Sequence, residues 1–279
     1  MRCIRLLKQA FYLQAVRAQK GQLLIEFEYT KRIKAKILDW GADLVGIADS
    51  EPLNELKVNP PDLLHGFTRA ISIAIQLPVY VFETISDKPT PIYAATYQTA
   101  NRILDELAFR TAVAIQKDGF NSLPIPASQV LDRKNWYAAI SHKAVARMAG
   151  LGWQGKNLLL ITPQFGSRVR LVTVLTHAPL IADTPLKNRC GSCMLCHDAC
   201  PAKAIRGVNT LDHYKNREEA LHFSRCVEKL TKDFAALSEI GAPICGICIK
   251  VCPFGKRIRK ENKRKKIVSK SSGAKKSNR

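Results

Sequence analysis

The sequence predicts an α+β protein with two domains, a mixed helix and strand domain at residues 37–182 and a small cysteine-rich domain at residues 187–256. Short apolar runs predict several strands in the first domain. Apolar residues at helical spacing over residues 91–117 predict a long helix beside those strands. Eight of the nine cysteines follow residue 189, so the second domain has a different composition from the first.

The elements of the first domain follow from periodicity and from the glycines that end helices. In chain order we expect a helix at 33–40, strands at 43–48 and 70–77, helices at 91–117 and 138–149, and strands at 157–161 and 169–175. The turn residues at 163–167 predict that the last two strands form a hairpin. In the second domain, helices are expected at 201–206 and within 211–230.

Residues 190–201 carry four cysteines in the spacing C-x2-C-x2-C-x3-C-P. This run holds 4Fe–4S clusters in bacterial ferredoxins, where the first three cysteines bind one cluster and the fourth binds the other. A second, split set follows. Cys226 stands alone, and Cys245, Cys248 and Cys252 repeat the end of the pattern, with Pro253 after the last cysteine.

We therefore expect two 4Fe–4S clusters whose ligands cross between the two sets. Cluster one would be bound by Cys190, Cys193, Cys196 and Cys252. Cluster two would be bound by Cys200, Cys226, Cys245 and Cys248. The alternative metal is zinc, which four thiolates also bind. Zinc sites usually consist of two C-x2-C pairs without a third cysteine at x2 or a Cys-Pro at x3, so the spacing favours clusters.

The cysteine usage also predicts the compartment. Thiolates that bind clusters persist in a reducing environment, so we expect a cytoplasmic protein without disulfides. No apolar run in the sequence approaches 18 residues, and we expect no membrane-spanning helix. Cys3 lies outside both patterns and is expected to be an unpaired thiol.

The formal net charge of +21 is concentrated at the two ends of the chain. Residues 1–36 hold nine Lys/Arg and two acids, and we describe them as a basic N-terminal extension. Residues 256–279 hold twelve Lys/Arg and one acid. The tail at 257–279 cannot bury a core and is predicted to be disordered. Such a tail can bind tRNA or another polyanion, or it can serve only as a solvated segment.

A glycine-rich motif precedes the cysteine-rich domain. Residues 149–161 read Ala-Gly-Leu-Gly-Trp-Gln-Gly-Lys-Asn-Leu-Leu-Leu-Ile, and Gly166-Ser167 and Pro179-Leu180 follow. Together with the cysteine runs and the displaced Cys226, this order resembles the epoxyqueuosine reductases and the related iron–sulfur part of reductive dehalogenases. The resemblance covers residues from about 37 to 255 and is strongest from residue 145 onward.

The resemblance implies a nitroreductase-like α/β sandwich that binds base-off cobalamin, followed by a bacterial-ferredoxin-like two-cluster domain that supplies it with electrons. It also implies a modified base of tRNA as the substrate. The candidate cofactor contacts in the motif are Gly152, Trp153, Gly155, Lys156 and Asn157. The same residues could instead only end a helix, turn the chain and pack.

Two positions depart from the family's catalytic pattern. The family's Arg-Asp-Tyr-His run falls at residues 95–98, where Tyr97 matches and Gln98 replaces the histidine. The family's acidic proton donor falls at Trp136. We therefore consider Tyr97 and Asp132, which lies four residues before Trp136, as the catalytic candidates.

The leading hypothesis is an iron–sulfur oxidoreductase of this kind. It would take electrons from a low-potential donor and relay them through two clusters to a site on the α+β domain. One alternative is a cobalamin-dependent epoxyqueuosine reductase that acts on tRNA in queuosine biosynthesis. A second is a ferredoxin-like electron carrier without its own substrate, and a third is a nucleic-acid binder that uses its basic ends.

Overall fold

The computed structural model describes residues 2–255, with side chains from residue 19 onward. At its centre is a four-stranded sheet in the order β1-β2-β6-β3, in which every neighbouring pair is antiparallel. A second sheet consists of β4 and β5. The strands are β1 (Leu44–Asp49), β2 (Arg69–Gln76), β3 (Ser122–Ile125), β4 (Trp153–Gln154), β5 (Leu160–Ile161) and β6 (Val169–Thr176).

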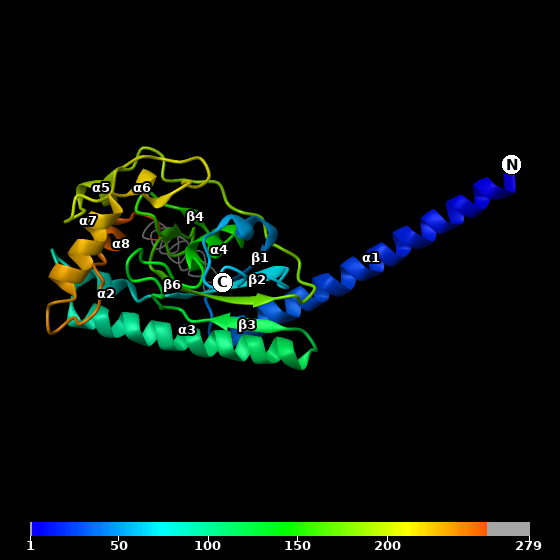
Figure 1. The fold of residues 1–279 in the computed structure, drawn as a ribbon, viewed down its shortest axis with the longest axis horizontal. Coiled ribbons are helices and arrows are strands. Elements are labelled where there is room, and N and C mark those ends of the chain that lie inside the picture. Colours follow the sequence, from blue (N-terminus) through cyan, green and yellow to red (C-terminus); the bar gives the residue numbers. More distant parts are fainter. Residues whose placement is uncertain (1, 256–279) are drawn as a thin grey trace, which may run out of the picture.

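The helices cover both faces of the central sheet and one end of it (Figure 1). The α-helices are α1 (Arg2–Asp39), α2 (Val79–Glu83), α3 (Pro91–Lys117), α4 (His142–Met148), α5 (Leu195–Asp198), α6 (Arg217–Ala220), α7 (Phe223–Glu228) and α8 (Ile247–Val251). A 3-10 helix spans Glu51–Glu55, and a π-helical turn spans Lys229–Phe234.

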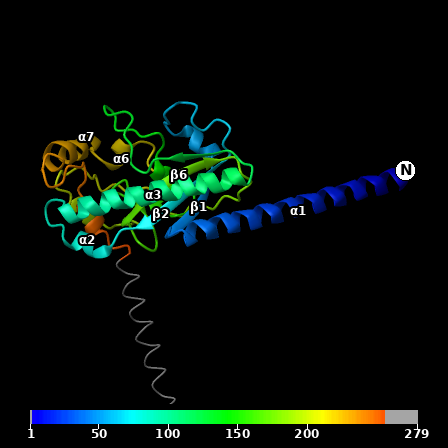
Figure 2. The same ribbon diagram turned by 90° about the horizontal axis from the view of Figure 1, so that it is seen from below.

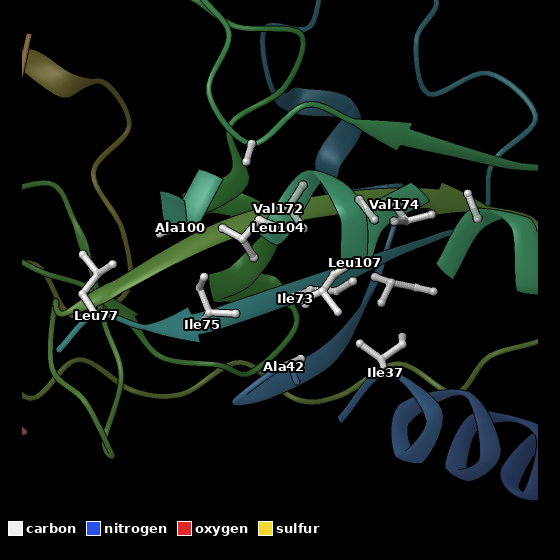
Figure 3. Close-up of a cluster of buried hydrophobic side chains, with 14 of the residues drawn as sticks. Ile37, Ala42, Ile73, Ile75, Leu77, Ala100, Leu104, Leu107, Val172 and Val174 are labelled. Atoms are coloured by element: carbon white, nitrogen blue, oxygen red, sulfur yellow. The ribbon is translucent and has the colours of Figure 1, made fainter. Parts of the chain in front are cut away.

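Strands β2 and β6 are buried on both faces, which explains why their sequences are almost continuously apolar. On one face, Ile73 and Val172 pack against Leu104 and Leu107 of α3 (Figure 3). On the other face, smaller residues such as Ala74 pack against α4. The sheet is therefore the middle layer between two sets of helices.

Helix α3 has the bounds that its periodicity predicts. The hydroxyl of Thr90 accepts the backbone N–H of Tyr93 at 3.3 Å, and Pro91 occupies the first helical position. Helix α4 is shorter than the predicted 138–149, because the Ser141 hydroxyl caps its first turn. Both helices end before a glycine in the left-handed region, as the sequence predicts.

Helix α1 is one continuous helix from Arg2 to Asp39, and most of its length projects away from the rest of the chain (Figures 1 and 2). Its last turns carry Ile33 and Ile37, which pack into the main core. The helix therefore runs through residue 36, the expected end of the basic extension. The tail at 257–279 lies outside the described residues.

The predicted hairpin of 157–161 with 169–175 is wrong. Strand β5 pairs with β4, and β6 pairs with β2 and β3. A tight turn explains this outcome, because the N–H of Leu158 donates to Gly155 O and the N–H of Gly155 donates to Leu159 O, both at 2.8 Å. The chain returns on itself at residue 155, before it reaches the turn at 163–167.

The cysteine-rich segment packs at one end of the central sheet (Figure 1). Ile240, Ile244 and Ile247 belong to the same buried core as α3. Two helices were expected here, and the outcome differs. Residues 201–206 form a turn with a single bridge to Leu221, and the range 211–230 contains two short helices, α6 and α7, separated at Leu221. The division of the chain into domains stays a prediction.

In the part of the chain that the structure describes, no helix combines the length and apolarity that crossing a membrane requires.

The packing of α3 gives a direct test of the core. Leu104 is completely buried, whereas its neighbour Ile103 is 44% exposed. We expect Leu104→Ala to lower the free energy of unfolding by about 2–5 kcal/mol. Ile103→Ala should change it by less than about 0.5 kcal/mol. Equilibrium unfolding in urea measures both, and equal effects would contradict the observed placement of α3.

Candidate metal centre

Four cysteines from opposite ends of the cysteine-rich segment line one cavity. Cys190, Cys193 and Cys196 come from its beginning and Cys252 from its end, and the cavity encloses about 350 Å³, including space open to solvent. The other lining residues are Lys156, Asn157, Ile161, Leu195, Pro253 and Phe254. The fold thus brings together the four thiols that the sequence assigns to cluster one.

Short hydrogen bonds fix the backbone at the first of these cysteines. The side-chain oxygen of Asn188 accepts the N–H of Cys190 at 2.8 Å, and its amide donates to Gln154 O at 2.9 Å. Gly191 follows with φ of 53°, which a glycine adopts without strain. The N–H of Cys193 then donates to Cys190 O at 3.2 Å. This turn directs the segment around the cavity.

The remaining cysteines lie near one another, because Cys226 and Cys248 pack against the buried cluster that contains Cys200. Burial raises the pKa of Cys226, and Cys200 adds to the rise. Burial raises the pKa of Cys245 to about 11, with further contributions from Cys226 and Cys200. Burial also raises the pKa of Cys248, and Cys245, Cys226, Cys196 and Cys200 add to it. These thiols are therefore neighbours, and Cys196 of the first group adjoins them.

The eight cysteines from Cys190 to Cys252 are free thiols, so each is available to bind a metal. Four thiolates can bind zinc or a 4Fe–4S cluster. The spacing of the cysteines along the sequence, with a third cysteine at x2 and a Cys-Pro at x3, favours clusters.

Buried donors without partners provide a second test of the fit. Within the described residues, the buried side-chain atoms that lack a hydrogen-bond partner are Ser72 Oγ, Trp153 Nε1, Ser167 Oγ and Arg168 Nε. The last three belong to residues beside Cys252. An unsatisfied buried polar group costs about 1–3 kcal/mol. Sulfur atoms of a cluster accept hydrogen bonds, so an anionic cluster would suit these donors.

The glycine-rich motif lies against the same cavity. Lys156 and Asn157 are buried and line it, and Lys156 Nζ donates to Cys193 O at 3.0 Å. Trp153 is fully buried. A Cβ on Gly152 would lie 2.3 Å from Ile161 O, so this glycine allows β4 and β5 to approach. Each part of the motif that these contacts describe supports the cysteine cavity.

The two catalytic candidates lie in different environments. Tyr97 Oη lies 3.0 Å from Ser128 Oγ and accepts a hydrogen bond from Arg170 at 3.2 Å. Asp132 accepts two hydrogen bonds from Asn135, which lower the pKa of its carboxyl. No contact described for residues 19–255 joins Tyr97 to Asp132.

Trp136, at the position of the family's acid, has φ of 56°. A bulky residue in the left-handed region is strained, and such strain is most often found at functional sites.

Sequence reasoning did not identify Ser167 and Arg168 as site residues. The Gly166-Ser167 pair was a signal for a turn, but nothing in the sequence indicates that Arg168 is buried against the cysteine segment.

Residues 189–255 match the sequence family described as the 4Fe-4S double cluster binding domain. An epoxyqueuosine reductase from Bacillus anthracis is 31% identical over 253 residues, which cover 77% of this chain and 62% of the relative. One from Synechococcus is 40% identical over 116 residues, covering 41% of this chain and 36% of the relative. This chain therefore spans less than two thirds of the length of these curated relatives.

Solved structures share the fold. A reductive dehalogenase, NpRdhA, bound to 3-bromo-4-hydroxybenzoic acid has a TM-score of 0.64 at 21% identity, covering 82% of this chain and 32% of that one. An epoxyqueuosine reductase with a modified tRNA stem loop has a TM-score of 0.55 at 24% identity, covering 82% and 66%. At these identities the likeness concerns the fold alone, and it confirms the predicted α+β class with a cluster domain at its C-terminal end.

The hairpin beside the cavity yields a prediction. Gly152→Ala forces a methyl group into the Ile161 carbonyl, and we expect it to lower the free energy of unfolding by about 1–3 kcal/mol. Gly21, in α1, has open space around its Cα. Gly21→Ala should therefore be neutral or stabilising by up to about 1 kcal/mol. Urea unfolding compares the two, and a tolerated Gly152→Ala would contradict the close approach of the strands.

Proposed function

We propose that this chain, which is a relative of the epoxyqueuosine reductases, is an iron–sulfur oxidoreductase that moves electrons through two 4Fe–4S clusters to a site on its α+β domain. A low-potential electron donor would reduce the clusters. Because the chain spans only 62% of the Bacillus anthracis relative, both its activity and its substrate are proposals.

The observation that carries the proposal is the shared cavity of Cys190, Cys193, Cys196 and Cys252. Three of these cysteines are close in sequence and the fourth is more than fifty residues away. This is the crossed pattern that two-cluster ferredoxins use. Cys200 contributes to the raised pKa of Cys226, Cys245 and Cys248, and it packs with Cys226 and Cys248, which supports a second site of the same kind.

The clusters, when bound, supply one-electron transfer, and the side chains around them determine how they are held. Lys156 is only 4% exposed and lines the cavity, so its charge would compensate an anionic cluster. Asn157 accepts the N–H of Leu159 at 3.2 Å and keeps the turn after β4 closed. The apolar side chains of Ile161, which is buried, and Leu195, which is half exposed, line the same cavity.

Cobalamin is the further cofactor that the resemblance implies. Of the five residues expected to contact it, Trp153, Lys156 and Asn157 are at most 6% exposed. Ile161 occupies the space beside Gly152 and Gly155, since a Cβ on either glycine would lie less than 3 Å from an atom of Ile161. These five residues fit a cluster site and do not fit an open site for a corrin ring. A corrin site would have to use other residues of the α+β domain.

The substrate proposal rests on the relatives. A modified base of tRNA is the substrate class that their name implies, and the basic ends of this chain offer positive charge to a polyanion. An electron carrier without its own substrate is the second candidate. The replacement of the family's acid by Trp136 favours that candidate, because a reductase of this kind needs a proton at the substrate.

The crossed ligand pattern predicts which substitutions act together. Wild-type protein reconstituted with iron and sulfide under anaerobic conditions should hold about eight irons per chain. Cys252→Ser should damage the same cluster as Cys190→Ser, and Cys200→Ser the same cluster as Cys226→Ser. Iron analysis and EPR spectra of the reduced proteins measure this. Cys3→Ser is the control and should keep both clusters.

If instead Cys200→Ser gave the spectrum of Cys190→Ser, the ligands would be sequential and the proposed pairing would be wrong. Zinc in place of iron would remove the redox function altogether.

The catalytic candidates predict weak epoxyqueuosine reduction. The hydrogen bonds from Asn135 lower the pKa of Asp132, so its carboxyl is ionised at neutral pH and cannot donate a proton. Loss of general acid catalysis costs a factor of about 100 to 10,000. We therefore expect little or no turnover of epoxyqueuosine-containing tRNA by reconstituted protein given hydroxocobalamin and a strong reductant. Visible spectra show separately whether cobalamin binds.

Turnover at the rate of a full-length relative assayed in parallel would contradict this prediction. If Asp132→Ala abolished such turnover while Asp87→Ala did not, Asp132 would be the proton donor and the tRNA reductase would become the leading function. Asp87 is a suitable control because its neighbour Ser86 likewise lowers the pKa of its exposed carboxyl.

A further inference from the structure

The end of the cysteine-rich segment packs against the turn that joins β5 to β6. A Cβ on Gly166 would lie 2.4 Å from Phe254 O, and one on Gly255 would lie 2.6 Å from the carbonyl carbon of Phe165. The two backbones are therefore in direct contact just after Cys252. The next two residues of the turn, Ser167 and Arg168, are 2% exposed.

Arg168 donates three hydrogen bonds to the backbone around Cys252. Its Nη1 donates to Phe254 O at 2.9 Å, and its Nη2 donates to Lys250 O at 2.9 Å and to Cys252 O at 3.2 Å. All three acceptors are neutral carbonyls, so these bonds do not neutralise the guanidinium charge. An arginine remains charged inside a protein, and its field is strong where water is excluded.

The position of Arg168 relates it to one of the two groups of cysteines. Its three hydrogen bonds all go to residues 250–254, which surround Cys252. Cys252 lines the same cavity as Cys190, Cys193 and Cys196. The buried guanidinium is therefore placed beside a ligand of cluster one.

Ser167 Oγ and Arg168 Nε also remain as buried donors without a partner that meets hydrogen-bond geometry. A cluster held by four thiolates is anionic and becomes more so on reduction. Hydrogen bonds to its sulfurs and nearby positive charge favour the reduced form. The Arg168 charge and the Ser167 hydroxyl beside Cys252 would therefore affect the reduction potential of the cluster as well as the packing.

We propose that Ser167 and Arg168 are positioning residues for electron transfer, which hold Cys252 in place and selectively raise the reduction potential of cluster one. The inference rests on the proposed cluster site and adds the residues that tune it. These side chains come from the α+β domain, so the potential of the cluster is set by a turn outside the segment that supplies its thiols.

The test uses full-length protein reconstituted with iron and sulfide, and a potentiometric titration followed by EPR. The reduction step of cluster one is identified as the one that disappears from the titration of Cys252→Ser. Ser167→Ala removes one hydroxyl and little volume, and its matched control is Ser72→Ala, because Ser72 Oγ in β2 is buried and unpartnered as well. Arg168→Met removes the charge, and Arg168→Lys keeps the charge but loses the forked contacts.

We expect Arg168→Met to make the reduction potential of cluster one more negative. At a fixed solution potential, the ratio of reduced to oxidised cluster should fall at least tenfold, which corresponds to about 59 mV for a one-electron couple. Ser167→Ala should shift the same step in the same direction by less. Arg168→Lys should lie between wild type and Arg168→Met. Cluster two should move less than cluster one in all three, and Ser72→Ala should move neither.

Wild-type potentials for cluster one in both Ser167→Ala and Arg168→Lys would overturn the inference, even if Arg168→Met failed to fold. Equal shifts of both clusters would overturn the claim of selectivity. If wild-type protein held no iron, the proposed function would fail first and the inference with it. Iron content, measured on every sample before titration, separates these results.

Discussion

The cysteine-rich segment holds eight thiols close together at partly or fully buried positions. Buried thiolates lose hydration and repel one another, which is why burial and the neighbouring cysteines raise the pKa of Cys196 to about 11. Bonds to iron would remove that penalty, and they would couple folding of the segment to metal binding. The segment has only a small buried cluster of its own, and its later part, with Ile240, Ile244 and Ile247, packs into the main core.

The α+β domain meets that need from two directions. Its main core includes Ile244 and Ile247, which hold the end of the segment against α3. Its β4–β5 hairpin brings the buried Lys156 to the cavity, and the turn before β6 brings the buried Arg168 to the backbone around Cys252. Residues outside the cysteine-rich segment therefore supply positive charge and hydrogen-bond donors close to its thiols.

Local patterns predicted what depends on local chemistry. The bounds of α3 follow from Thr90, Pro91 and a regular apolar face, and the cysteine spacing identified the thiols that the fold brings together. Long-range packing was not predictable in the same way. The strand at 160–161 turns back onto β4 because glycines permit a close approach, and a hairpin with β6 would satisfy the same apolar pattern. Arg168 lies in an ordinary strand sequence, and only the folded chain shows which carbonyls it contacts.

Diffraction from crystals of the reconstituted protein, measured at the iron absorption edge, tests the central claim most directly. Anomalous scattering locates the irons independently of any assumption about ligands. We predict two iron sites of cluster size, one bounded by Cys190, Cys193, Cys196 and Cys252, the other by Cys200, Cys226, Cys245 and Cys248. A single site, or one bounded by the sequential run of Cys190, Cys193, Cys196 and Cys200, would contradict the account.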